Sequence, residues 1–211
     1  MTFSIAGRCA KSGAFGVAIT TSSIAVGARC PHARAGVGAV ATQNVTDPNL
    51  GPMLLDLMSQ GLSARAAIDS IIHDRPFIEY RQLTAVDSKG NSASWSGKHI
   101  LGTHGVSEER DCVAAGNLLK SPDLPKVMTD YFARNATEHL AERLLRSLEA
   151  GLESGGEEGP VHSAALIVYH RQYFPLVNLR VDWDDENLIK FLRKLWEDYR
   201  PQMAAYLQRA I

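Results

Sequence analysis

The sequence has few cysteines, almost no net charge and no long hydrophobic run. Its three cysteines, Cys9, Cys30 and Cys112, are an odd and scattered set, which is typical of reduced thiols in a cytoplasm. The 22 Lys and Arg residues nearly balance 23 Asp and Glu residues, so nothing predicts binding to nucleic acid or to an anionic membrane. No apolar run approaches the about 20 residues of a spanning helix. The amino terminus also lacks the basic and apolar regions of a signal peptide. We therefore expect a cytoplasmic protein.

Composition favours one globular domain. The chain has 211 residues, of which 45% are hydrophobic and 21% are charged, and these values are typical of a folded domain. No internal repeat is visible, and the Gly-rich stretch at 154–159 is too short to act as a domain linker. We expect a single domain over residues 1–211, with a C-terminal helical extension over about 184–211.

Hydrophobic periodicity separates predicted strands from predicted helices. Period-2 alternation or short apolar runs predict strands over 2–8, 15–21, 24–28, 35–41, 80–86, 91–96, 112–116, 164–169 and 176–181. Apolar residues at helical spacing predict helices over 48–60, 64–72, 124–132, 140–148 and 185–200, with Ser63 as the cap of the second. Gly97 to Arg110 is predicted as loop. Strands and helices occur in blocks and do not alternate, which favours an α+β fold over a parallel βαβ sheet.

The first predicted strand begins directly after the initiator methionine. If Met1 is removed, Thr2 becomes a terminal threonine whose hydroxyl is a nucleophile and whose α-amine is a built-in general base. An α-amine has a pKa of about 7.7–8.0, so much of it is already neutral near physiological pH. A terminus that lies inside a sheet would hold such a nucleophile rigidly.

Several stretches resemble the family catalogued as domain of unknown function 1028, a branch of the N-terminal-nucleophile (Ntn) hydrolases. The resembling stretches are Thr2-Phe3-Ser4-Ile5, the run from Ala33 to Gln43, Gln60-Gly61-Leu62-Ser63-Ala64, Gly116-Asn117 and Ser163-Ala164-Ala165-Leu166. This resemblance implies a four-layer αββα sandwich of the Ntn-hydrolase type. It implies no particular substrate. The sequence departs from the family pattern at His162 and at Cys30-Pro31-His32, which suggests a different ligand if these positions shape the pocket.

The resemblance also implies roles for residues near the nucleophile. Arg34 follows the second predicted pair of strands, where Ntn enzymes keep a cation beside the nucleophile. Gln43, Asn44 and Asn117 are candidate donors for an oxyanion. Substrate contacts are expected from residues at strand ends, namely Thr21, Ser22, His32, His162 and Ser163. Residues 20–23 supply only hydroxyls, where Ntn enzymes often place a carboxylate.

Two functions remain open from the sequence, with a metal-dependent hydrolase, which metal analysis would reveal, as a distant third. The first is an Ntn-type amidohydrolase that cleaves a small-molecule or peptide-like amide, and the second is a catalytically silent Ntn-like module for binding or assembly. Cys30 and His32 with His99, His104 or Cys112 match no zinc template, so neither a metal nor a cofactor is predicted. The layered fold and the final helix favour a homo-oligomer.

Overall fold

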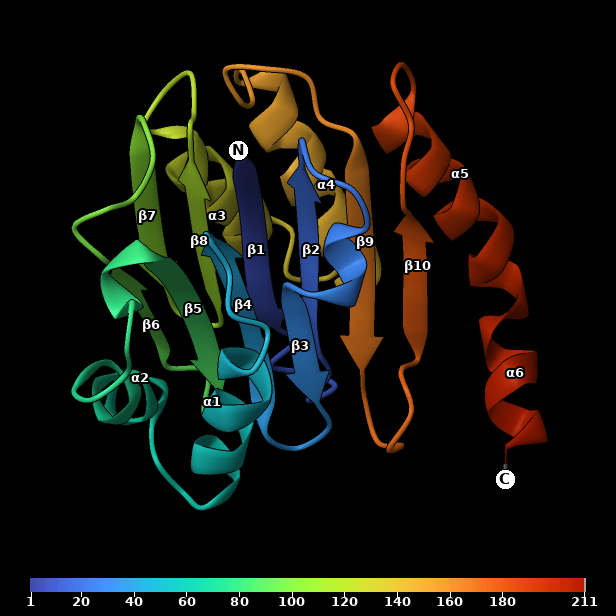
Figure 1. Cartoon of the computed structure of the whole chain (residues 1–211). Helices are drawn as coiled ribbons and strands as arrows, with labels where there is room; N and C mark the ends of the chain where they lie inside the picture. The colour runs from blue at the N-terminus through green and yellow to red at the C-terminus, as the bar shows by residue number, and fades with distance from the viewer. Residues whose placement is uncertain (211) are drawn as a thin grey trace.

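Two antiparallel sheets and a set of helices make up the computed structural model, which describes residues 1–210 (Figure 1). The larger sheet has the order β10-β9-β2-β1-β8-β7 and the smaller sheet the order β3-β4-β5-β6. The strands are β1 (Thr2–Arg8), β2 (Phe15–Thr21), β3 (Pro31–Arg34), β4 (Gly38–Asn44), β5 (Arg81–Asp87), β6 (Ser92–Ser96), β7 (His104–Glu109), β8 (Cys112–Asn117), β9 (Ser163–Tyr169) and β10 (Val177–Val181). The fold is therefore mixed α+β, as the blocks in the sequence predict.

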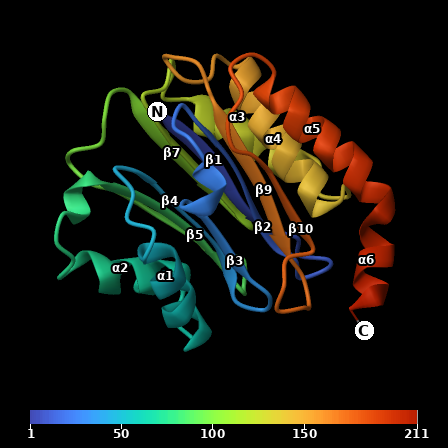
Figure 2. The same ribbon diagram turned by 45° about the vertical axis from the view of Figure 1, so that its right-hand side comes forward.

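Helices cover the outer faces of both sheets. The helices are α1 (Leu50–Ser59), α2 (Ala64–Ile72), α3 (Leu124–Arg134), α4 (Leu140–Glu153), α5 (Leu188–Tyr199) and α6 (Met203–Arg209). Figure 2 shows α1 and α2 on the side of the smaller sheet and α3 and α4 on the side of the larger one. Within residues 1–210, none of these helices is both long and apolar enough to cross a membrane.

Three buried clusters match this stacking. One cluster joins the larger sheet to α3, α4 and α5, and its largest side chain is the fully buried Trp196. A second joins the smaller sheet to α1 and α2. The third lies between the two sheets, and small residues such as Ala6, Ala39 and Ala165 lie in it beside larger valine and isoleucine side chains. The predicted C-terminal extension thus begins with a helix whose inner face belongs to the core.

Strand β1 lies at the centre of the larger sheet between β2 and β8. The predicted hairpin of residues 2–8 and 15–21 is confirmed, with Thr2 opposite Thr21 and Arg8 opposite Phe15. The predicted cap at Ser63 is also confirmed, because its side chain accepts a hydrogen bond from the Ala66 amide. The order of the strands therefore places the start of the chain in the middle of a six-stranded sheet.

Some predicted elements were wrong. Residues 24–28 form no strand, since Ala25 adopts a left-handed conformation and Val26–Ala28 form a 3-10 turn. The stretch predicted as one strand over 35–41 is a turn followed by β4, and β3 precedes it. The predicted loop over 97–110 contains the edge strand β7. The predicted final helix is confirmed as α5, which ends at Tyr199, and Pro201 lies in the 3-10 segment that leads from it into α6.

Candidate functional site

Four polar side chains form a row across one end of the larger sheet. Thr2 lies opposite Asn117 on one side and Thr21 on the other, and Thr21 lies opposite Ser163. Directly opposed residues project from the same face of a sheet. Residues two or four positions along each of these strands belong to the core between the sheets, so the row faces the smaller sheet. We call these four residues the polar row.

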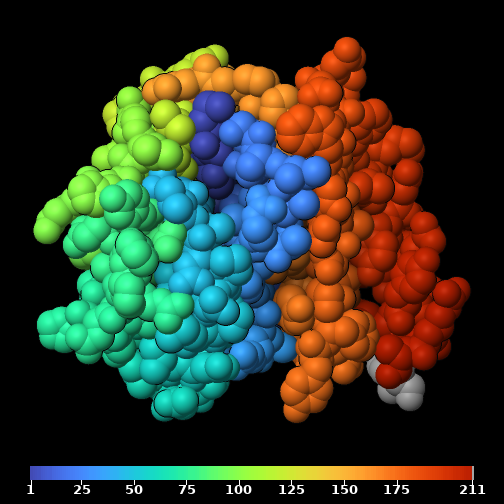
Figure 3. Space-filling view, viewed as in Figure 1, coloured from blue at the N-terminus to red at the C-terminus, as the bar shows by residue number. Residues whose placement is uncertain are grey.

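Thr2 is held by hydroxyl contacts within the polar row. Its side chain is buried, and its Oγ1 lies 2.9 Å from Oγ1 of Thr21. The Thr2 hydroxyl donates to the carbonyl oxygen of Met1 at 2.5 Å, and the Thr21 hydroxyl donates to the same oxygen. Removal of Met1 would therefore free both hydroxyls at once. The dark-blue start of the chain reaches the surface on the face shown in Figure 3.

Asn117 is the predicted oxyanion donor that lies directly opposite Thr2. It is fully buried, and its Nδ2 donates to Oδ1 of Asn44 at 3.1 Å. Asn44 has a left-handed backbone with a φ of 70° and is fixed by a bond from its Nδ2 to the Tyr80 carbonyl at 2.7 Å. Asn44 thus orients Asn117, while Oδ1 of Asn117 has no hydrogen-bond partner among the described residues.

Gln43 joins the two sheets. The Ser4 hydroxyl donates to Oε1 of Gln43 at 2.6 Å, and Nε2 of Gln43 donates to Oε1 of Gln82 at 2.7 Å. Gln82 in turn donates to the Ser96 hydroxyl at 3.1 Å. This buried network begins two residues after Thr2 on the same strand face. The amide of Gln43 is therefore occupied by sheet-to-sheet contacts.

The structure places Arg34 away from Thr2, and this corrects the expectation that it lies beside the nucleophile. Arg34 lies opposite Gly38 at the start of β4, six residues before Asn44, and hence about 20 Å along the strand from the end that holds the polar row. Its side chain is 41% exposed, and its guanidinium forms an ion pair of 2.8 Å with Asp56 of α1. An exposed pair of this kind contributes little to stability or to the site.

His32 is also remote from the polar row. Its ring packs against Gly51 of α1, and its Nε2 lies 3.1 Å from the carbonyl oxygen of Arg29. Burial lowers the pKa of its imidazole. With Arg34 it lines a separate cavity of about 260 Å³. Among residues 1–210, no three His, Cys, Asp or Glu side chains are grouped so that they could hold a metal ion.

The remaining predicted substrate contacts belong to the polar row, as Thr21 and Ser163 do, or adjoin it directly along the chain, as His162 and Ser22 do. The Ser163 hydroxyl donates to the Ser23 carbonyl at 2.6 Å and accepts from the Val26 amide at 3.0 Å, which fastens the loop after β2. The His162 amide donates to the Thr21 carbonyl at 2.8 Å, and its ring stacks on Trp183 at 4.5 Å between centroids. Ser22 is half-buried directly after Thr21.

Glu157 is a feature that the sequence did not reveal. It is only 2% exposed, and neither of its carboxylate oxygens has a hydrogen-bond partner among the described residues. Burial raises the pKa of this carboxyl to about 8, and the ammonium of Met1 opposes the shift. A bridge to Leu119 of the opposing chain segment holds the backbone of Glu157 in place. Its setting in an acidic, Gly-rich stretch predicted only a flexible loop, so no sequence signal pointed to it.

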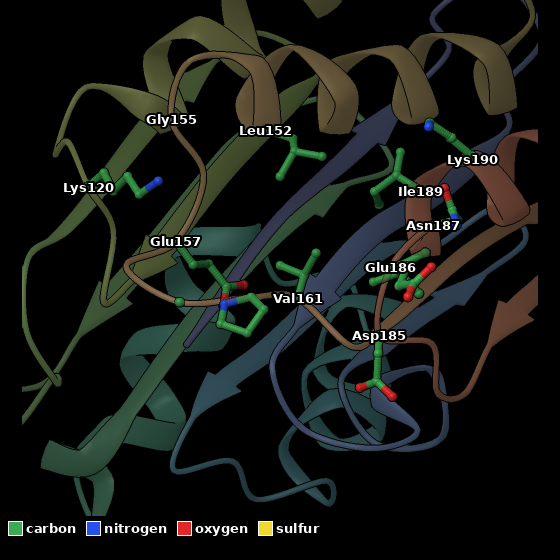
Figure 4. Close-up of a pocket in the computed structure, with 13 residues that line it drawn as sticks. Lys120, Leu152, Gly155, Glu157, Val161, Asp185, Glu186, Asn187, Ile189 and Lys190 are labelled. Carbon is green, nitrogen blue, oxygen red and sulfur yellow. The ribbon is translucent and has the colours of Figure 1, made fainter.

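Glu157 also lines a cavity of about 330 Å³ near the start of the chain. In Figure 4, Lys120 borders one side of this cavity and the segment from Asp185 to Lys190 borders the other, with Glu157 and Val161 between them. The cavity therefore has charged groups of both signs on its walls.

The comparisons with known proteins place the chain in a family. The model described as "Family of unknown function (DUF1028)" matches residues 2–191. The chain belongs to this family. The crystal structure of protein SPO2555 from Silicibacter pomeroyi, also described as a DUF1028 protein, is 28% identical with a TM-score of 0.86. That match covers 94% of this chain and 88% of the other.

Other solved structures are much less similar to this DUF1028 chain. Anbu (ancestral beta-subunit) from Yersinia bercovieri is 12% identical with a TM-score of 0.41, and the match covers 96% of each chain. An Anbu mutant from Hyphomicrobium is 16% identical with a TM-score of 0.44, over 97% of each chain. Likenesses at this level carry no argument about function. The comparison with curated proteins found no match.

Proposed function

We propose that this DUF1028 protein is an amidohydrolase of the Ntn type, and that Thr2 is its nucleophile after Met1 is removed. The observation that carries the proposal is the position of Thr2 at the start of the central strand, with its hydroxyl beside that of Thr21. The packing of two sheets between helices is consistent with the αββα sandwich that the family resemblance implies. The substrate would be a small-molecule or peptide-like amide.

The geometry supports a short mechanism. The free α-amine of Thr2 would take the proton of its own hydroxyl, and the oxygen would attack the amide carbonyl. Asn117 lies directly opposite Thr2 in the sheet, and its Nδ2, which Asn44 orients, would donate a hydrogen bond to the resulting oxyanion. The amine of the substrate would leave with the proton, and water would then hydrolyse the acyl ester of Thr2. No metal or cofactor takes part in this proposal.

The first experiment compares the intact mass and the turnover of the purified protein with those of Thr2→Ala and Thr2→Ser. A mass without methionine, activity on a panel of amides, and loss of about a thousandfold or more in kcat/KM in Thr2→Ala would support the proposal. Thr2→Ser keeps both the amine and a hydroxyl, so it should retain part of the activity. Activity in protein that still carries Met1 would refute the terminal-threonine mechanism.

A catalytically silent binding or assembly module is the alternative outcome of this experiment. The distance of Arg34 from Thr2 favours it, since the cation expected beside the nucleophile is absent from that place. Protein that lacks Met1 but hydrolyses no amide of the panel would support the module. A homo-oligomer in the cytoplasm remains a prediction under either function, which size-exclusion chromatography with light scattering would test for assembly.

A further inference from the structure

The carbonyl oxygen and the side chain of Met1 both contact the folded chain. Its carbonyl oxygen accepts hydrogen bonds from the hydroxyls of Thr2 and Thr21. Its side-chain methyl lies against Gly159, where an added Cβ would come within 2.8 Å of Cε. Its ammonium opposes the raised pKa of Glu157 from a distance, since neither carboxylate oxygen of Glu157 has a hydrogen-bond partner in the part of the chain that the structure describes. A carbonyl, a side chain and an α-ammonium together make up an aminoacyl group.

The Glu157 carboxyl lines the same cavity as Gly159 and has no partner of its own within residues 1–210. It is almost completely buried, and no described residue donates a hydrogen bond to either oxygen. A buried ionised carboxylate is strongly unfavourable unless a cation or several donors accompany it. When Met1 leaves, its side chain vacates the place against Gly159, and the cavity that Glu157 lines is open to a ligand with a cation.

We propose that the place held by Met1 becomes the acyl subsite, and that it selects substrates with a free α-ammonium, namely amides of α-amino acids. This inference rests on the proposed function and names its substrate class. Glu157 would bind the ammonium, Gly159 would leave room for an unbranched side chain, and the hydroxyls of Thr2 and Thr21 would lie at the carbonyl. Other cations near this carboxyl are the terminal amine of Thr2, one residue or about 3.8 Å further along the chain, and the side chains of Lys120 and Lys190, which line the same cavity.

The test measures binding apart from catalysis. Thr2→Ala protein whose mass shows loss of Met1 keeps the vacated place but lacks the nucleophile. L-methioninamide and N-acetyl-L-methioninamide would be titrated into it by calorimetry. We expect the free amine to bind about tenfold to a hundredfold more tightly, the range for a hydrogen bond between charged groups. Adding Glu157→Gln should abolish the difference between the two probes.

Glu158→Gln is the matched control, because Glu158 is the exposed neighbour and carries the same charge. It should leave the preference for the free amine unchanged. The acetylated probe tests the inference without any change at Glu157, so poor folding of a Glu157 variant would not decide the result.

Two outcomes would overturn the inference. One is equal affinity for both probes, or binding of neither, in Thr2→Ala protein. The other is an equal loss of turnover on all amides in Glu157→Gln, which would mean that the carboxylate serves the amine of Thr2. Selective binding of the free amine by protein that hydrolyses nothing would instead refute the proposed function and leave the ammonium subsite in place.

Discussion

Replacement of Glu157 by glutamine should stabilise the protein that retains Met1, and more so as the pH rises. Burial moves the pKa of the carboxyl from an ordinary 4.5 to about 8 in the folded chain. Between these values the folded state keeps a proton that the unfolded state has released, so the free energy of unfolding falls as the pH rises. Each pKa unit corresponds to about 1.4 kcal/mol. The wild type should therefore lose about 3 kcal/mol by pH 7 relative to Glu157→Gln.

Urea unfolding at about pH 5, 6, 7 and 8 tests this prediction through the difference in free energy of unfolding between the two proteins. The difference should be small at the lowest pH and grow by about 1.4 kcal/mol per unit until the folded-state pKa near 8 is reached. Glu158→Gln removes the same charge from an exposed neighbour and should change stability by no more than about 0.5 kcal/mol. A constant difference between wild type and Glu157→Gln across the range would refute the reasoning.

Two further predictions concern the core. Gln43→Ala leaves the buried Ser4 hydroxyl and the side-chain amide oxygen of Gln82 without their partner. It should therefore lower the free energy of unfolding by about 2–5 kcal/mol in urea titrations. An unchanged midpoint would contradict the network. Trp196→Ala should cost about 3–5 kcal/mol, and Trp196→Phe should cost less because it keeps an aromatic ring in the core and loses only part of the ring volume and the bond to Glu142. If Trp196→Ala unfolds at the same urea concentration as the wild type, α5 is not part of the core.

The sequence predicts the elements that carry a clear apolar period. The hairpin of β1 and β2 and the helices α1 to α4 follow directly from alternation or from a helical stripe, because burial of one face demands that spacing. Strand β7 is not predicted from the sequence. It is an edge strand with mostly exposed side chains, so its residues show no apolar alternation. Strand β3 has only four residues, too few for any period to be read.

The sequence predicts part of the candidate site, because several of its residues stand at the ends of predicted strands. Thr2, Thr21, Asn117 and Ser163 stand at strand ends in the sequence, and the register of three strand pairs brings them into one row. Arg34 also stands at a strand end, but at the end of the smaller sheet that is opposite to Asn44 along the strand direction. Residue type and local spacing cannot distinguish these two ends, because the direction in which β3 and β4 cross the larger sheet is a property of the whole fold.

Glu157 shows what local reading of a sequence misses at this site. A carboxylate in an acidic, Gly-rich stretch is normally solvated, and nothing in the residues beside it predicts burial. Its burial follows from contacts made by distant parts of the chain, namely the bridge from Glu157 to Leu119 and the Met1 side chain against nearby Gly159. Glu157 stays protonated in the folded chain near neutral pH, and a substrate ammonium beside it would favour its ionised form. Loss of Met1 would therefore both expose a nucleophile and open the place beside Glu157, which ties the proposed chemistry to the proposed choice of substrate.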